Sequence, residues 1–207
     1  MRGVRERAGR ALLGLLRYRV EGRPPAADGA CVVVAAPHTS WLDFPIMLGI
    51  AWSNGMRLGF LAKKELFRAP FGTVMRRLGG IEVDRDRPGT LVADLASRAR
   101  TDDPFALVVA PEGTRARART WKSGFYRIAR EAGVPLVLAF VDGPTRTCGF
   151  GPTFLPTGDV VADMDVLRAF YADKRGVRPD RATPPRLGEE TRAAAAPAPP
   201  EEPAAAG

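Results

Sequence analysis

Short apolar runs alternate with longer amphipathic stretches along most of the chain. The runs carry Val, Leu and Ile at successive positions, which is typical of strands covered by helices on both faces. The expected strands are residues 31–36, 58–62, 80–84, 105–110 and 136–142. The expected helices are residues 41–53, 69–78, 88–100, 121–132 and 162–173. This alternation predicts one α/β domain, over residues 28–182, with a mostly parallel or mixed central sheet flanked by helices.

The two ends of the chain have a different composition. Residues 1–25 predict a basic amphipathic N-terminal helix, which runs over residues 2–20 and in which Arg5 and Arg19 intrude on the apolar arc. That arc comprises Val4, Ala8, Ala11, Leu12, Leu15, Leu16 and Tyr18. Such a helix either lies in the interface of an anionic membrane or packs on its own domain with a solvated arginine face. Residues 183–207 consist largely of Ala, Pro and Glu, and we expect a disordered tail.

Composition excludes several classes of protein. The 207 residues are 45% hydrophobic and 26% charged, which is not typical of a disordered chain, a collagen-like repeat or a polytopic membrane protein. The net charge of +8 favours an anionic partner: nucleic acid, a lipid surface or a phosphorylated small molecule. No nucleic-acid partner is expected, because the chain has no such motif and its Tyr and Trp residues are not interleaved with arginine. Cys31 and Cys148 make no disulfide framework.

His38 is the one histidine of the chain. It follows a predicted strand and precedes a predicted helix, so its imidazole can lie exposed in the turn. Asp43, in the first turn of that helix, can fold back to fix the tautomer of the ring and strengthen it as a base. Two plainer interpretations remain: a surface histidine, and a capping box with Ser40 at the N-cap and Asp43 at N3.

A second candidate site follows the strand expected at residues 105–110. In Pro111-Glu-Gly-Thr-Arg115 the glycine permits unusual backbone angles, the threonine offers a hydroxyl, and the arginine offers a guanidinium fork. Arg85, at the end of another expected strand, offers a second fork. Both lie at the carboxyl ends of strands, where α/β sheets bind ligands, and together they can hold a phosphate. The plainer interpretation is a polar turn and an arginine at a strand end.

Several blocks of the sequence resemble one known family. The HX4D motif of the PlsC-like glycerolipid acyltransferases resembles Pro37-His-Thr-Ser-Trp-Leu-Asp43. The family's second block resembles residues 62–67 and 80–85, and its third matches residues 111–115. Trp121-Lys-Ser-Gly124 and Val134-Pro135 resemble the blocks that follow. Pro37 stands where the family commonly has Asn, and Leu138 where it often has a second Pro.

The resemblance implies transfer of a fatty acyl group from acyl-CoA or acyl-carrier protein to a hydroxyl of a (lyso)phospholipid-type acceptor, such as 1-acylglycerol-3-phosphate. His38 would be the general base and Asp43 its orienting partner. The residues implied for the acceptor's phosphate are Arg85, Glu112, Gly113, Thr114, Arg115 and Lys122. No metal and no bound cofactor are implied. The resemblance also implies a peripheral (monotopic) location on the cytoplasmic face of a membrane.

Three points stay open. The acceptor can be a non-glycerolipid, such as a glycolipid or an amine lipid. The protein can also be a catalytically silent basic protein that binds lipid or phosphate. The apolar positions at residues 44–52, with Phe71, Val74, Met75 and Leu78, either line a slot for an acyl chain or form ordinary core.

Overall fold

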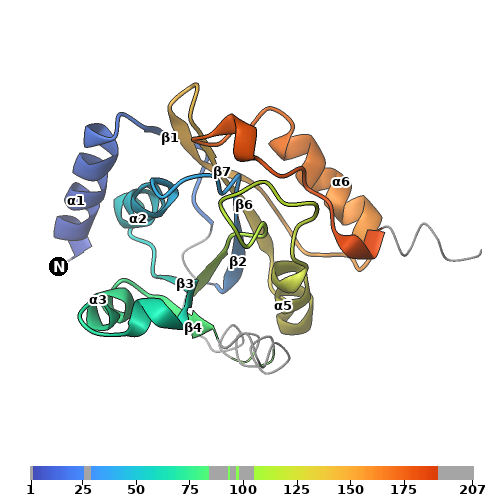
Figure 1. Cartoon of the computed structure of the whole chain (residues 1–207), viewed down its shortest axis with the longest axis horizontal. Coiled ribbons are helices and arrows are strands. Elements are labelled where there is room, and N and C mark those ends of the chain that lie inside the picture. Colours follow the sequence, from blue (N-terminus) through green and yellow to red (C-terminus); the bar gives the residue numbers. More distant parts are fainter. Residues whose placement is uncertain (1, 26–28, 84–92, 94–96, 98–104, 191–207) are drawn as a thin grey trace, which may run out of the picture.

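The computed structural model describes residues 2–25, 29–83, 93, 97 and 105–190. Within them lies a seven-stranded sheet of order β1-β7-β6-β2-β5-β3-β4 (Figure 1). The strands are β1 (Arg19–Glu21), β2 (Cys31–Ala36), β3 (Leu58–Lys63), β4 (Gly80–Val83), β5 (Ala106–Val109), β6 (Leu136–Asp142) and β7 (Thr147–Phe154). Neighbouring strands pair in parallel except β6 and β7, which are antiparallel. The expected α/β domain with a mixed central sheet is confirmed.

Helices cover both faces of the sheet (Figure 1). One face carries α1 (Arg2–Leu15), α2 (Asp43–Ser53) and α3 (Gly72–Arg77), and the other carries α5 (Gly124–Ala132) and α6 (Val160–Tyr171). The central strand β2 contributes side chains to both hydrophobic cores, because its successive side chains point to opposite faces of the sheet. Val32 and Val34 pack with the α5 and α6 cluster, whereas Cys31 and Val33 pack with the α1 and α2 cluster. This arrangement explains why β2 is apolar at every position.

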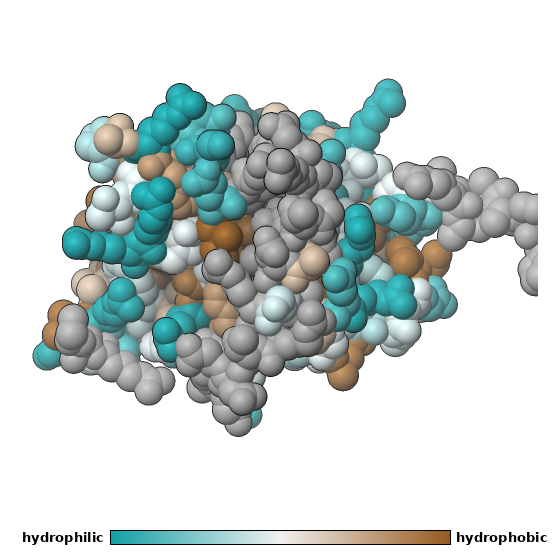
Figure 2. Space-filling view, turned by 90° about the horizontal axis from the view of Figure 1, so that it is seen from below, coloured by the Kyte–Doolittle hydropathy of each residue, from teal (hydrophilic) through white to brown (hydrophobic). Residues whose placement is uncertain are grey.

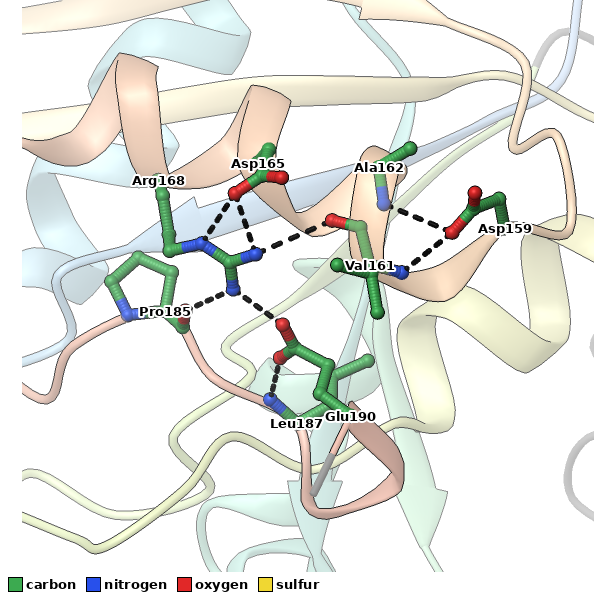
Figure 3. A network of polar contacts seen from close by, with 8 residues as sticks. All are labelled: Asp159, Val161, Ala162, Asp165, Arg168, Pro185, Leu187 and Glu190. Atoms are coloured by element: carbon green, nitrogen blue, oxygen red, sulfur yellow. Dashed lines mark hydrogen bonds and ion pairs between the residues drawn. The ribbon is translucent and has the colours of Figure 1, made fainter. Parts of the chain in front are cut away.

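Local signals set the ends of the two helices on the second face. Gly133, with φ +68°, ends α5 in the left-handed conformation that glycine adopts without a steric penalty. Asp159 begins α6, because its carboxylate accepts hydrogen bonds from the backbone N–H groups of Val161 and Ala162 at 3.0 and 3.1 Å (Figure 3). Two short 3₁₀ helices, η1 (Lys64–Phe67) and η2 (Pro179–Arg181), complete the described elements.

The two strands at one end of the sheet, β1 and β7, were not expected from the sequence. We expected the first helix to continue to residue 20, but α1 ends at Leu15 and Arg17 adopts φ +58°. The chain therefore turns, and β1 pairs with β7, Arg19 opposite Thr147. Neither strand shows an apolar run: β1 is exposed at each position, and β7 contains two glycines and a proline. Their strand conformation comes from pairing rather than from the local pattern.

The predicted domain limits also change. Residues 1–25 are not a separate segment, because β1 belongs to the sheet and Leu13 to its core. We expected the disordered tail to begin at residue 183, but the next residues still pack on the domain. Leu187 is fully buried, and Trp121 N–H donates to the carbonyl of Arg186 at 2.8 Å. Residues 191–207 lie outside the described residues, as does most of the helix expected at 88–100. Both cysteines are free and buried.

Candidate active site

His38 and Asp43 meet in the turn between β2 and α2. The imidazole Nδ1 lies 3.0 Å from the carboxylate Oδ2 of Asp43. When Nδ1–H donates to that oxygen, Nε2 carries the free lone pair and can accept a proton. The His38 side chain is 23% exposed and lines a large cavity. The geometry is that of a base held by a carboxylate.

Asp43 also organises the backbone of the same turn. Its Oδ2 accepts hydrogen bonds from the N–H groups of Thr39 and Ser40 at 2.8 and 2.9 Å. The hydroxyl of Ser40 in turn accepts from Leu42 N–H at 3.2 Å. The contact from Ser40 N–H to Asp43 is one half of the expected capping box, but the Ser40 hydroxyl bonds Leu42 rather than Asp43, and α2 has Leu42, not Ser40, at its N-cap. Asp43 therefore holds both the imidazole and the backbone of the turn, without a complete capping box.

Glu112 supports the turn from beneath. Its side chain is 2% exposed, and its Oε1 accepts a hydrogen bond from His38 N–H at 2.9 Å. Burial raises the pKa of Glu112 to about 7, although the hydrogen bond from His38 N–H opposes the rise. Unlike Gly113, Thr114 and Arg115, it is absent from the cavity wall. The expectation that Glu112 binds an acceptor phosphate is therefore replaced by a role in holding the His38 turn.

The loop that follows β5 brings cations to the cavity. Gly113 has φ +64°, and a Cβ there would lie 3.5 Å from Cγ of Lys122. Lys122 is fixed by its N–H, which donates to the carbonyl of Pro111 at 2.7 Å. The guanidinium of Arg115 stacks on the Trp41 ring, with its carbon 3.3 Å from the ring centre. The structure thus places Gly113, Thr114, Arg115 and Lys122 on the wall of the cavity that His38 also lines. Arg85 lies outside the described residues.

The cavity has a volume of about 1410 Å³ and two kinds of wall. Its polar wall contains His38, Arg115 and Lys122. Its apolar wall lies between the sheet and α2 and comprises, among others, Phe44, Met47, Ile50, Ala51, Met56, Leu58, Phe60, Met75 and Phe150. Of the residues expected for an acyl slot, Phe71, Val74 and Leu78 do not line it. Phe71, at the N-cap of α3, and Val74, within α3, are exposed.

Several lining residues were not expected from the sequence. Met56 precedes β3 and Phe60 lies within it, and the position of β3 in the sheet brings both residues to the cavity. Phe150 belongs to the unexpected strand β7. Arg181 lies more than 140 positions from His38 in the chain, and no motif signalled it. For the apolar wall, the apolar positions at residues 44–52 and Met75 were the useful signals in the sequence. Within the described part of the chain, no cluster of three or more potential metal ligands occurs.

Comparison with known proteins agrees with this fold. A family model described as Acyltransferase matches residues 17–141. The match covers more than half of the chain, and the chain belongs to this acyltransferase family. Among solved structures, the 1-acyl-sn-glycerophosphate (LPA) acyltransferase PlsC from Thermotoga maritima is similar, with a TM-score of 0.59 and 22% sequence identity over 85% of this chain and 78% of that chain. The likeness shows that the two share a fold. No match was found among curated proteins.

Proposed function

We propose that this acyltransferase moves a fatty acyl group from a thioester, acyl-CoA or acyl-carrier protein, to a hydroxyl of a lysophospholipid-type acceptor such as 1-acylglycerol-3-phosphate. The contact between His38 Nδ1 and Asp43 at 3.0 Å, at a cavity with one cationic and one apolar wall, carries the proposal. The family supplies the reaction class, and the similarity to the T. maritima 1-acyl-sn-glycerophosphate acyltransferase supports the choice of acceptor.

His38 acts as the general base. Its Nε2 takes the proton of the acceptor hydroxyl while that oxygen attacks the thioester carbonyl, which forms a tetrahedral oxyanion. When the oxyanion collapses, the C–S bond breaks and the imidazolium returns the proton to the thiolate. The products are an ester and a free thiol, and no acyl-enzyme is required. Asp43 keeps the ring in the required tautomer. It can do so because the N–H groups of Thr39 and Ser40 hold its carboxylate in a fixed position.

The cationic wall binds phosphate. The stacked guanidinium of Arg115 presents its fork from a fixed plane, which suits a phosphate better than a mobile side chain does. Lys122 adds a second positive charge beside Gly113. The apolar wall beneath α2 accommodates an acyl chain, whose burial removes hydrocarbon from water. No bound cofactor and no metal takes part in this proposal.

The acceptor and product are membrane lipids, so we place the protein on the cytoplasmic face of an anionic membrane as a peripheral, monotopic protein. Gly9 and Leu13 of α1 face the domain, yet Val4 and Leu15 are 63% and 81% exposed. Ala8 and Ala11 share this outer side, and we call Val4, Ala8, Ala11 and Leu15 the α1 stripe. Apolar surface on the lower face of the molecule is interrupted by hydrophilic side chains (Figure 2). Among the described residues, no helix has the length and apolarity needed to cross a bilayer.

The test is an acyl-transfer assay with His38→Ala. Labelled acyl-CoA and acyl-carrier protein are offered with 1-acylglycerol-3-phosphate, a glycolipid and an amine lipid, and products are read by lipid mass spectrometry. We expect the phosphate-bearing acceptor to be used, and His38→Ala to lower kcat by roughly 10²- to 10⁴-fold. Thioester-dependent transfer that survives the substitution would overturn the mechanism. Lipid binding without turnover by the wild type would instead indicate a silent binding protein.

A further inference from the structure

The segment after α6 joins the two halves of the candidate active site. We call residues 178–183 the bridge. At one end, Arg178 N–H donates to the hydroxyl of Thr39, next to His38, at 3.0 Å. At the other end, the Thr183 hydroxyl accepts from Ala118 N–H at 2.9 Å, and the Thr183 carbonyl accepts from the indole N–H of Trp121 at 3.0 Å. The bridge therefore spans from the His38 turn to the loop that carries Arg115 and Lys122.

The chain beyond the bridge is locked onto α6. Arg168 donates to the carboxylates of Asp165 and Glu190 and to the carbonyls of Pro185 and Val161 (Figure 3). Glu190 is buried, and its second oxygen accepts from Leu187 N–H at 2.6 Å. This latch holds the C-terminal end of the bridge, so the side chains that the bridge presents have a defined place.

Arg181 is the bridge residue that lines the cavity. Its side chain is 42% exposed, and its ion-pair partner Asp180 lies 3.9 Å away and is 79% exposed. A contact of that length between solvated groups is weak, so the guanidinium keeps most of its capacity to bind another anion. Its five N–H donors match the oxygens of a phosphate.

We propose that Arg181 binds a phosphate group of a substrate, and so completes from a distant part of the chain the cationic wall of Arg115 and Lys122. The proposal rests on the proposed acyl transfer, in which both the acceptor and a CoA or carrier-protein donor contain phosphate. The shared chemistry is a phosphate oxygen accepting from a guanidinium. Which substrate supplies it is decided by the two arms of the experiment.

The experiment compares Arg181→Gln and Arg181→Lys with the wild type. One arm varies a short-chain 1-acylglycerol-3-phosphate at saturating acyl-CoA, and the other varies acyl-CoA at saturating acceptor. We expect Arg181→Gln to raise KM in one arm roughly tenfold or more, with kcat changed far less, and Arg181→Lys to restore part of the loss. Arg186→Gln is the matched control, because its side chain is exposed, carries the same charge and does not line the cavity.

Failure of this proposal is distinguishable from failure of the proposed function. Unchanged KM in both arms, a loss confined to kcat, or an equal effect of Arg186→Gln overturns the assignment of Arg181 while the acyl transfer stands. If the wild type transfers no acyl group, the proposed function fails. Calorimetric binding of the same acceptor and of CoA then tests Arg181 directly: weaker binding by Arg181→Gln supports it, and equal binding by both proteins overturns it.

Discussion

The two sides of the cavity mouth are held in opposite ways. In the His38 turn, one buried carboxylate oxygen of Asp43 holds the imidazole and two backbone N–H groups, and a second buried carboxylate supports the turn from below. On the other side, Arg115 stacks on a Trp41 ring that is 72% exposed, and Lys122 is also exposed. Proton transfer needs a ring held in hydrogen-bonding geometry by buried groups, whereas a phosphate can be bound by cations that remain partly in contact with solvent. Buried groups should therefore affect rate and stability, and exposed groups should affect binding.

Arg115→Gln tests the exposed side and should give the larger change. Loss of the guanidinium removes a charge-assisted contact with phosphate, so KM for a phosphate-bearing acceptor should rise roughly 10- to 100-fold while kcat falls much less. Steady-state kinetics at saturating donor measures both constants. Trp41→Leu removes only the stacking surface and should raise the same KM by less. A fall in kcat with KM unchanged would place Arg115 with the buried groups and break the comparison.

Glu112→Gln tests the buried side. Because burial raises the pKa of Glu112 to about 7 from an ordinary value of 4.5, its carboxyl group binds its proton more tightly in the folded state. Its contribution to stability is therefore complete below about pH 4.5 and is lost as pH rises through 7. The glutamine retains a carbonyl acceptor for His38 N–H but cannot ionise. We expect the variant to gain stability relative to the wild type between pH 5 and pH 8, on the order of 1 to 3 kcal/mol.

Urea unfolding at pH 5 and pH 8 measures that gain. The informative quantity is the difference between the two proteins at each pH, because the other titrating groups are common to both and cancel. An identical pH dependence for the two proteins would mean that Glu112 does not carry its proton in the folded state near neutral pH.

The parts of the site that the sequence predicted are those made by neighbours in the chain. His38 and Asp43 are five positions apart, and Gly113, Thr114 and Arg115 belong to one loop, so their place in the chain predicted which of them would meet, while the spacing alone left plainer interpretations open. Glu112 was misplaced because its position within a polar loop does not reveal that its side chain turns inward to a backbone N–H 74 positions away. Arg181 was missed for the same reason: its place depends on contacts that the bridge makes with Thr39 and Trp121.

The same distinction applies to the fold. Strands β2, β5 and β6 are apolar on both faces and were predicted from that pattern. Strands β1 and β7 were not predicted, because they are held by pairing, β1 with β7 and β7 also with β6. In α1 the helix itself was predicted, but the direction of its buried face was not. Gly9 packs against the backbone of α2, where a Cβ would lie 2.4 Å from Ser53 N. Close approach at a glycine is invisible to a hydrophobicity pattern, so the pattern did not reveal that the side of α1 with Gly9 and Leu13 is the buried one.

Substitutions in the α1 stripe should have the smallest effect. The helix shows the same contrast as the cavity, because one side of α1 is buried in the core and the other is exposed. Deleting α1 would remove Leu13 from the core, so point substitutions are the better test. Val4→Ser with Leu15→Ser should weaken binding to anionic liposomes about tenfold and leave the melting temperature almost unchanged, because both side chains are exposed. Gly14→Ser is the control, since Gly14 is exposed beside the stripe and has open space around it. Co-sedimentation that is equal for the double variant and the wild type would assign lipid contact to another surface.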